Sequence, residues 1–152
     1  MITWGVAGRE EIGQLSRWVA EIIWPGQRRE FGNCQGLGII DGDKLIGGVI
    51  YHNYEPDAGV VELSAASTSK RWLTRETLRV MFALPFVDWG CQAVVLRVPD
   101  HDEAMHSIAK RYGFVHYRIP RLRGRDRAEN VFVLTDDVWR ENRFNRKENG
   151  HG

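Results

Sequence analysis

A polar turn with two cations is the first stretch of this sequence whose residue types could do chemistry. Ser67-Thr68-Ser69-Lys70-Arg71 brings hydroxyl groups and two positive side chains to the predicted start of a helix. Free backbone N–H groups and the positive end of the helix dipole suit such a turn to an anion, above all a phosphate. The same residues also fit an ordinary turn between a strand and a helix, so the sequence leaves two interpretations.

Acid–base chemistry has two candidate side chains in the middle of the chain. Glu62 is the only carboxylate in the predicted strand 60–65, and it could act as a general base. The alternative is a solvent-facing residue or one half of an ion pair. His52, between Tyr51 and Tyr54 in the sequence, could relay a proton or be an ordinary surface histidine.

Metal and nucleophile sites have weaker sequence signals. His101 and His106 have aspartate neighbours, but their spacing matches no standard zinc signature. Cys34 and Cys91 lack a paired histidine, and the sequence has no nucleophile elbow. We expect both cysteines to be reduced structural thiols, with one disulfide as the alternative.

The predicted elements show how these residues would be positioned. Periodic apolar residues and Gly or Pro breaks predict strand 1–6, a helix from Ile12 to Ile23, strands 36–40, 44–53 and 60–65, helix 72–84, strand 93–98, a helix capped by Asp100 and ended by Gly113, strands 115–119 and 129–134, and a helical turn at 136–142. Asp41-Gly42-Asp43 is typical of a hairpin turn. The helix before strand 93–98 favours a parallel pair with strand 60–65.

This order predicts an α/β fold: one domain with a mixed, mostly antiparallel sheet of six or seven strands flanked by helices. The chain has 152 residues and a net charge of +1, which fits a single domain and gives no general argument for a nucleic acid partner. No apolar run is long enough for a membrane span. We expect a cytoplasmic protein with a domain at 1–142 and a flexible polar tail at 143–152.

Two stretches resemble the GNAT superfamily, the Gcn5-related N-acetyltransferases. Trp72-Leu73-Thr74-Arg75-Glu76-Thr77-Leu78 looks like the Gly-Tyr-Ala-Thr-Glu-Ala-Leu pattern of that family, and the segment from Val98 to Phe114 looks like its strand, turn and helix ending in Leu-Gly-Phe. The element order agrees over residues 2 to 135. The resemblance is greatest to ribosomal-protein N-acetyltransferases and phage-borne relatives.

The resemblance implies an acetyl-CoA site between two splayed strands, the fourth and the fifth. The backbone of Leu63, Ser64 and Ala66 would bind the pantetheine arm. The family's pyrophosphate loop corresponds to Ser69-Lys70-Arg71-Trp72-Leu73-Thr74, so that the predicted cofactor-binding residues of this loop are Lys70, Arg71, Trp72, Leu73 and Thr74.

The chain departs from the family at several of these positions. Trp72 and Thr74 replace small residues that let the backbone approach phosphate closely. Asp102 stands where an asparagine often meets the cofactor, and Ala109 stands where a tyrosine often protonates the leaving thiolate.

The predicted function is therefore acetyl transfer from acetyl-CoA to a primary amine, with Glu62 as the catalytic base. The acceptor could be a protein N-terminus, a lysine or a small molecule, and a homodimer is left open. The departures favour an alternative, a GNAT-fold binding or assembly protein without catalysis, in a phage context.

The arginines between Arg118 and Arg127 could steer an acidic partner or bind nucleic acid; otherwise they form a solvated hairpin balanced by Asp126 and Glu129.

Overall fold

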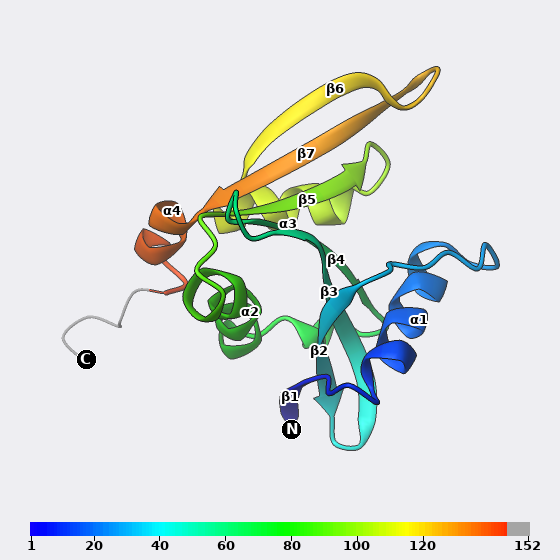
Figure 1. Ribbon diagram of the computed structural model, residues 1–152, viewed down its shortest axis with the longest axis vertical. Helices are drawn as coiled ribbons and strands as arrows, with labels where there is room; N and C mark the ends of the chain where they lie inside the picture. The colour runs from blue at the N-terminus through cyan, green and yellow to red at the C-terminus, as the bar shows by residue number, and fades with distance from the viewer. Residues whose placement is uncertain (146–152) are drawn as a thin grey trace.

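The computed structural model describes residues 1–145, which form one mixed sheet with helices on both faces (Figure 1). The predicted tail falls mainly on residues 146–152, which lie outside the described residues. The elements are β1 (Ile2–Val6), α1 (Ile12–Ile23), β2 (Cys34–Asp41), β3 (Lys44–Glu55), β4 (Val60–Ser67), the 3-10 helix η1 (Lys70–Trp72), α2 (Arg75–Ala83), the π-helical turn η2 (Leu84–Asp88), β5 (Ala93–Pro99), α3 (Glu103–Tyr112), β6 (Val115–Gly124), β7 (Arg127–Thr135) and α4 (Asp136–Glu141).

Within residues 1–145 seven strands pair in the order β1-β2-β3-β4-β5-β7-β6. Every neighbouring pair is antiparallel except β4 and β5. The β2–β3 hairpin turns at Gly42, whose φ of 67° suits glycine. The structure confirms the predicted α/β class, the Asp-Gly hairpin and the parallel pair.

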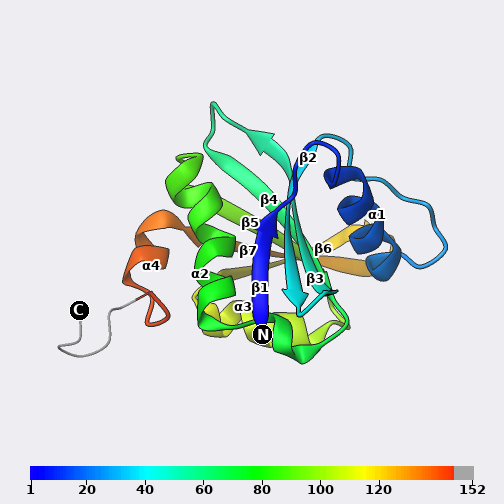
Figure 2. The same ribbon diagram turned by 90° about the horizontal axis from the view of Figure 1, so that it is seen from below.

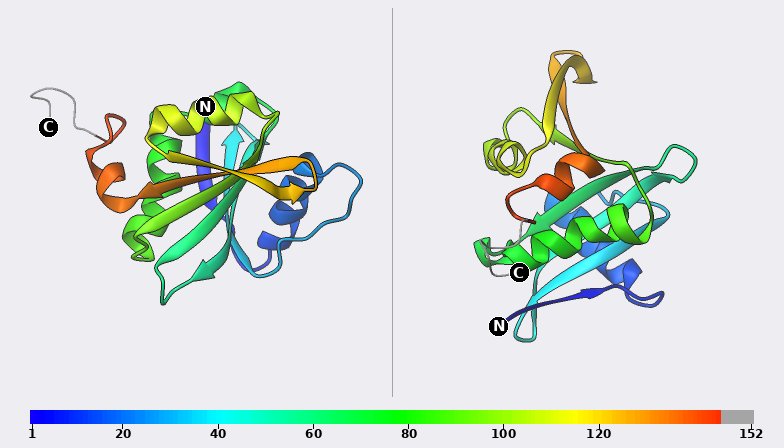
Figure 3. Two further views of the ribbon diagram at one scale, coloured as in Figure 1. Left: turned by 90° about the horizontal axis from the view of Figure 1, so that it is seen from above. Right: turned by 90° about the vertical axis from the view of Figure 1, so that its left-hand side faces the viewer.

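The helices divide unevenly between the two faces of the sheet (Figures 2 and 3). Side chains of α2, α3 and α4 join the large apolar cluster on one face, which includes Met81, Tyr112 and Trp139. On the other face α1 packs Leu15 and Val19 against β2, β3 and β4. Within residues 1–145 α1 is the only helix on that face, so β5, β6 and β7 are left without a helical cover there.

β4 and β5 separate after a short paired region. Only Val60–Leu63 of β4 pairs with 93–96 of β5, while β4 itself continues to Ser67 alongside β3. Figure 1 shows the two strands diverging towards the side of the molecule that carries α1 and the β6–β7 hairpin. The predicted splay of these two strands is confirmed.

Several element ends differ from the sequence prediction for local reasons. The α2 helix begins at Arg75, not residue 72, because Thr74 and Thr77 form a capping box there. Trp72 belongs to the separate turn η1. The α3 helix is capped by Asp102, whose carboxylate accepts from the Met105 amide; the prediction that Asp100 caps it was wrong.

The helices between residues 1 and 145 include none with the length and apolar character that crossing a bilayer requires. Cys34 and Cys91 are both free thiols, in agreement with the first of the two alternatives for the cysteines.

Candidate active site

The opening between β4 and β5 exposes part of a strand edge. Beyond Leu63, β4 has a strand neighbour only on its β3 side. Because backbone N–H and C=O groups point alternately to the two sides of a strand, residues from Ser64 to Ser67 present some of these groups to the opening. Leu63 is the last residue of β4 that pairs with β5, and its side chain is buried. The predicted positions Leu63, Ser64 and Ala66 therefore border this opening.

Four polar side chains from β3 and β4 meet beside the opening, on the sheet face that carries α1. His52 Nε2 lies 2.8 Å from Ser64 Oγ and 3.8 Å from Glu62 Oε2. Asn53 Nδ2 donates to Glu62 Oε1 at 3.0 Å and lies 3.3 Å from His52 Nδ1. The Glu62 side chain is only 16% exposed, so this carboxylate is held in place but still reached by solvent.

The hydrogen bonds around His52 assign its tautomer. Because the Asn53 amide nitrogen can only donate, Nδ1 of the imidazole is the acceptor and Nε2 carries the proton. Burial lowers the pKa of His52, Glu62 raises it, and Arg97 lowers it. The net shift is downward, so the ring is neutral at pH 7 and can accept a proton at Nδ1.

The predicted phosphate turn is present, and its two cations differ in their surroundings. Ser69 Oγ accepts from the Arg71 amide and starts η1. Arg71 Nη1 donates to Asp41 Oδ2 at 2.7 Å, although its side chain remains 66% exposed. Lys70 is exposed and has no ion pair within residues 1–145.

Trp72 does not stand at the surface of this turn. The residue is 7% exposed, and its ring packs into the large apolar cluster against Gly47 of β3. Leu73 packs partly against the same cluster, and the Thr74 hydroxyl accepts from the Thr77 amide at 3.0 Å. The Trp72 side chain therefore serves the fold, whereas the side chains of Leu73 and Thr74 make internal contacts but are only half-buried.

Other residues that the sequence singled out are used structurally. The Tyr51 hydroxyl donates to the Met81 carbonyl and ties β3 to α2. Tyr112 is buried and accepts from Trp139 Nε1, and the Ala109 position is 1% exposed. Tyr51 and Tyr112 are therefore held by contacts inside the fold and are not available as proton donors at the strand opening.

A charged cluster on β5, β6 and β7 was not foreseen as part of a site. The Glu129 side chain is 3% exposed and contacts Arg97 at 3.1 Å and Arg123 at 3.1 Å. The backbone amide of Asn130 also donates to Glu129. From the sequence, Glu129 is only a candidate counter-charge of the hairpin; its contact to Arg97, 32 residues away, depends on strand register.

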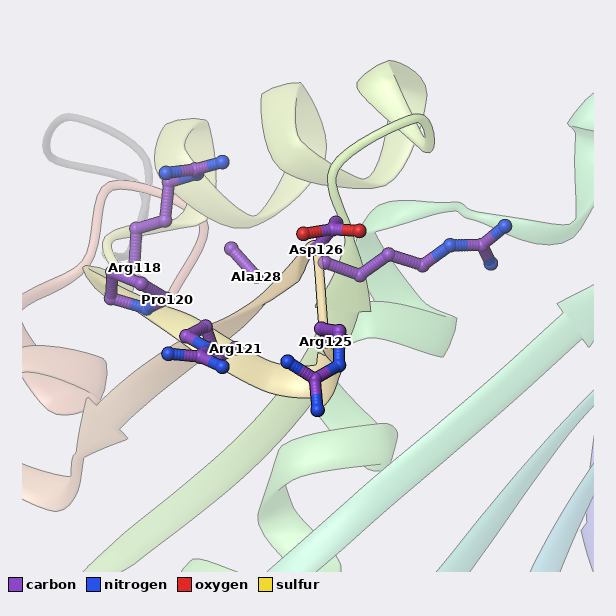
Figure 4. Close-up of a pocket in the computed structure, with 7 residues that line it drawn as sticks. Arg118, Pro120, Arg121, Arg125, Asp126 and Ala128 are labelled. Carbon is purple, nitrogen blue, oxygen red and sulfur yellow. The ribbon is translucent and has the colours of Figure 1, made fainter.

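The remaining arginines surround a hollow of about 520 Å³ at the β6–β7 tip (Figure 4). Arg118 is bound to Asp100 through two hydrogen bonds. Within residues 1–145 Asp126 makes no ion pair, so it is not the balancing charge that the sequence suggested. Figure 4 shows the Arg118 and Arg125 side chains pointing in different directions, so the hollow lacks a converging anion cradle.

Comparisons with known proteins place this geometry in a known fold. No protein-family model and no curated protein matches the chain. Among solved structures, mutant forms of the spermidine/spermine N-acetyltransferase SpeG from Vibrio cholerae align over 93% of this chain and 98% of theirs, at 12% identity and a TM-score of 0.72.

A second solved structure, assigned as an acetyltransferase, aligns over 72% of this chain at 16% identity and a TM-score of 0.63. This chain spans only 63% of the length of that protein. The comparisons, the strand order and the splay of β4 and β5 together show that the chain has the fold of the N-acetyltransferases.

Proposed function

We propose that this protein is an N-acetyltransferase that transfers an acetyl group from acetyl-CoA to a primary amine. One observation carries the proposal: the unpaired edge of β4 lies beside the polar cluster of Glu62, His52 and Asn53. A thioester aligned along β4 would then have hydrogen-bond donors on one side and a proton acceptor on the other. Structures with the same fold belong to acetyltransferases, which supports the reaction class.

Each part of the site has a role in this reaction. The amine nitrogen attacks the thioester carbonyl carbon, the C–S bond breaks, and the thiolate leaves. A backbone N–H of β4 donates to the carbonyl oxygen as negative charge develops on it. Glu62 takes the proton that the ammonium or amine loses, while Asn53 keeps the carboxylate oriented. His52 receives or passes on a proton through Nδ1, because its ring is neutral.

The cations of the turn are assigned to the cofactor's phosphates. Lys70 and Arg71 precede the amino end of α2, and both side chains are exposed. Trp72 is folded away against Gly47, so it does not occupy the surface where phosphate would lie. The loop therefore binds through two cations and backbone amides, without the family's glycine.

The alternative is a protein of this fold that binds a partner and has no catalytic activity. Ala109 in place of the tyrosine and Asp102 as an acidic cap of α3 favour it. Calorimetric titration with acetyl-CoA, with free CoA as a second ligand, separates the two functions. Micromolar binding of acetyl-CoA and CoA release with an amine panel are expected. Absence of binding at millimolar acetyl-CoA would contradict the enzyme proposal and favour the alternative.

A further inference from the structure

Arg97 follows immediately after Leu96, the last residue of β5 that pairs with β4, and so lies at the mouth of the strand opening. Leu96 pairs with Leu63, and Val95 pairs with Glu62. Because side chains two residues apart in a strand share a face, Arg97 points to the same face as Val95, and therefore as Glu62. The separation along the strand from Glu62 is two residues, about 7 Å.

Glu129 fixes two guanidinium groups at this position. Arg97 donates only through Nε to Glu129 Oε2, at 3.1 Å. Arg123 donates to Oε1 through Nε at 3.2 Å and Nη2 at 3.1 Å. The carboxylate is buried, whereas the Arg97 and Arg123 side chains are 45% and 33% exposed. One negative charge thus orients two positive charges, and the terminal nitrogens of Arg97 make no hydrogen bond within residues 1–145.

The side chains around this pair are exposed. Arg97, Val131 and Tyr117 are neighbours across three strands, and Tyr117 is 54% exposed. In the next row Ile119, beside Glu129, is 39% exposed. Since α1 covers only β2, β3 and β4 on this face, a molecule whose amine lies at Glu62 would extend over these side chains.

We propose that Arg97 and Arg123 form an anion clamp that binds a carboxylate of the acceptor. The acceptor is then an anionic primary amine, such as an amino acid or a peptide N-terminus next to an acidic residue. This inference rests on the proposed function, because Glu62 marks the amine position. Guanidinium groups bind carboxylates with paired, charge-assisted hydrogen bonds. A polyamine would place its second cation against the surplus positive charge, so the clamp selects against it.

The test compares three peptides that differ at one side chain with two small-molecule acceptors of opposite charge. The tetrapeptide amides Ala-Glu-Ala-Ala, Ala-Gln-Ala-Ala and Ala-Lys-Ala-Ala, free glutamate and spermidine are assayed for CoA release. We expect kcat/KM to be about tenfold higher for the Glu peptide than for the Gln peptide, which corresponds to about one charge-assisted hydrogen bond, and lowest for spermidine. A preference for free glutamate over the Glu peptide assigns the carboxylate to an amino acid, and the reverse assigns it to a peptide.

Two variants locate the effect at the clamp. Arg97→Gln and Arg123→Gln should each raise KM for the Glu peptide towards that of the Gln peptide, so that the ratio of the two KM values approaches one. Each single change leaves Glu129 bound to the other arginine, so no buried carboxylate loses all its partners, and thermal unfolding verifies the fold. Arg118→Gln is the matched control, because Arg118 lies on β6 and binds Asp100.

The result that would overturn the clamp is a wild-type protein that acetylates the Gln peptide or spermidine as well as the Glu peptide. An Arg97→Gln variant that prefers the Glu peptide over the Gln peptide as strongly as the wild type does would also overturn the clamp. Failure of the proposed function is seen separately as absent acetyl-CoA binding. Calorimetric titration with the Glu and Gln peptides alone then still decides the clamp: tighter binding of the Glu peptide supports it, and equal binding refutes it.

Discussion

Trp72 packs so closely on Gly47 that a Cβ added to Gly47 would lie 2.9 Å from Trp72 Cε3. The glycine of β3 therefore makes room for a tryptophan that stands where the sequence pattern it resembles has a small residue. This contact turns the Trp72 ring into the core and keeps it from the exposed turn that carries Lys70 and Arg71. The packing of Trp72 on Gly47 therefore connects the turn that carries Lys70 and Arg71 to strand β3.

Gly47→Ala should destabilise the protein by about 1–3 kcal/mol, because the added methyl group overpacks a rigid ring. Equilibrium denaturation with urea measures the free energy of unfolding. Gly5→Ala is the matched control, since a Cβ there meets no atom within 4 Å. Equal stability of the two variants would show that Trp72 moves without cost and that this packing does not hold the turn.

The sequence predicts the strands and their order along the chain well, because apolar periodicity and Asp-Gly turns are local signals. The predicted start of α2 is three residues too early, because the apolar side chain of Trp72 extends the apolar pattern of the helix. The capping box of Thr74 and Thr77 starts the helix only at Arg75. The contacts of Trp72 with Gly47 and of Arg97 with Glu129 join distant strands, so only tertiary structure reveals them.

Arg71→Ala should weaken acetyl-CoA binding about tenfold, as expected for the loss of one charge-assisted phosphate contact. Its pair with Asp41 is exposed, so the cost to stability should stay below about 1 kcal/mol. Asp41→Asn removes the same ion pair but keeps the cation, and it should leave the affinity unchanged or improve it. Calorimetry on both variants checks this. Unaltered affinity in Arg71→Ala, and in the Lys70→Ala/Arg71→Ala double variant, would refute the phosphate assignment.

Glu62→Gln should lower kcat by about 100-fold to 10,000-fold, the usual effect of losing a general base, without changing acetyl-CoA affinity. The amide oxygen of glutamine still accepts from Asn53, so the local structure should persist. Steady-state rates of CoA release and cofactor titration provide the two readouts. Glu55→Gln, at the exposed end of β3, removes the same charge elsewhere and should retain wild-type rates. A wild-type rate for Glu62→Gln across the pH range would assign the base to another group.

The stability of the protein should fall in acid through His52. Burial is the main cause that lowers the pKa of His52 below 6.5, so the unfolded chain binds this proton more readily than the folded one. The contribution of the neutral ring to stability is therefore complete above pH 6.5 and is lost as the pH falls below that value towards the lowered pKa.

His52→Gln, which can still donate to Ser64, should flatten the dependence of Tm on pH between 6.5 and 5. Thermal unfolding across this range compares it with His101→Gln, a change in an exposed histidine that should keep the wild-type slope. If His52→Gln loses Tm in acid as steeply as the wild type, the buried neutral imidazole is not the origin of the acid sensitivity, and its assigned role as a proton carrier beside Glu62 loses its support.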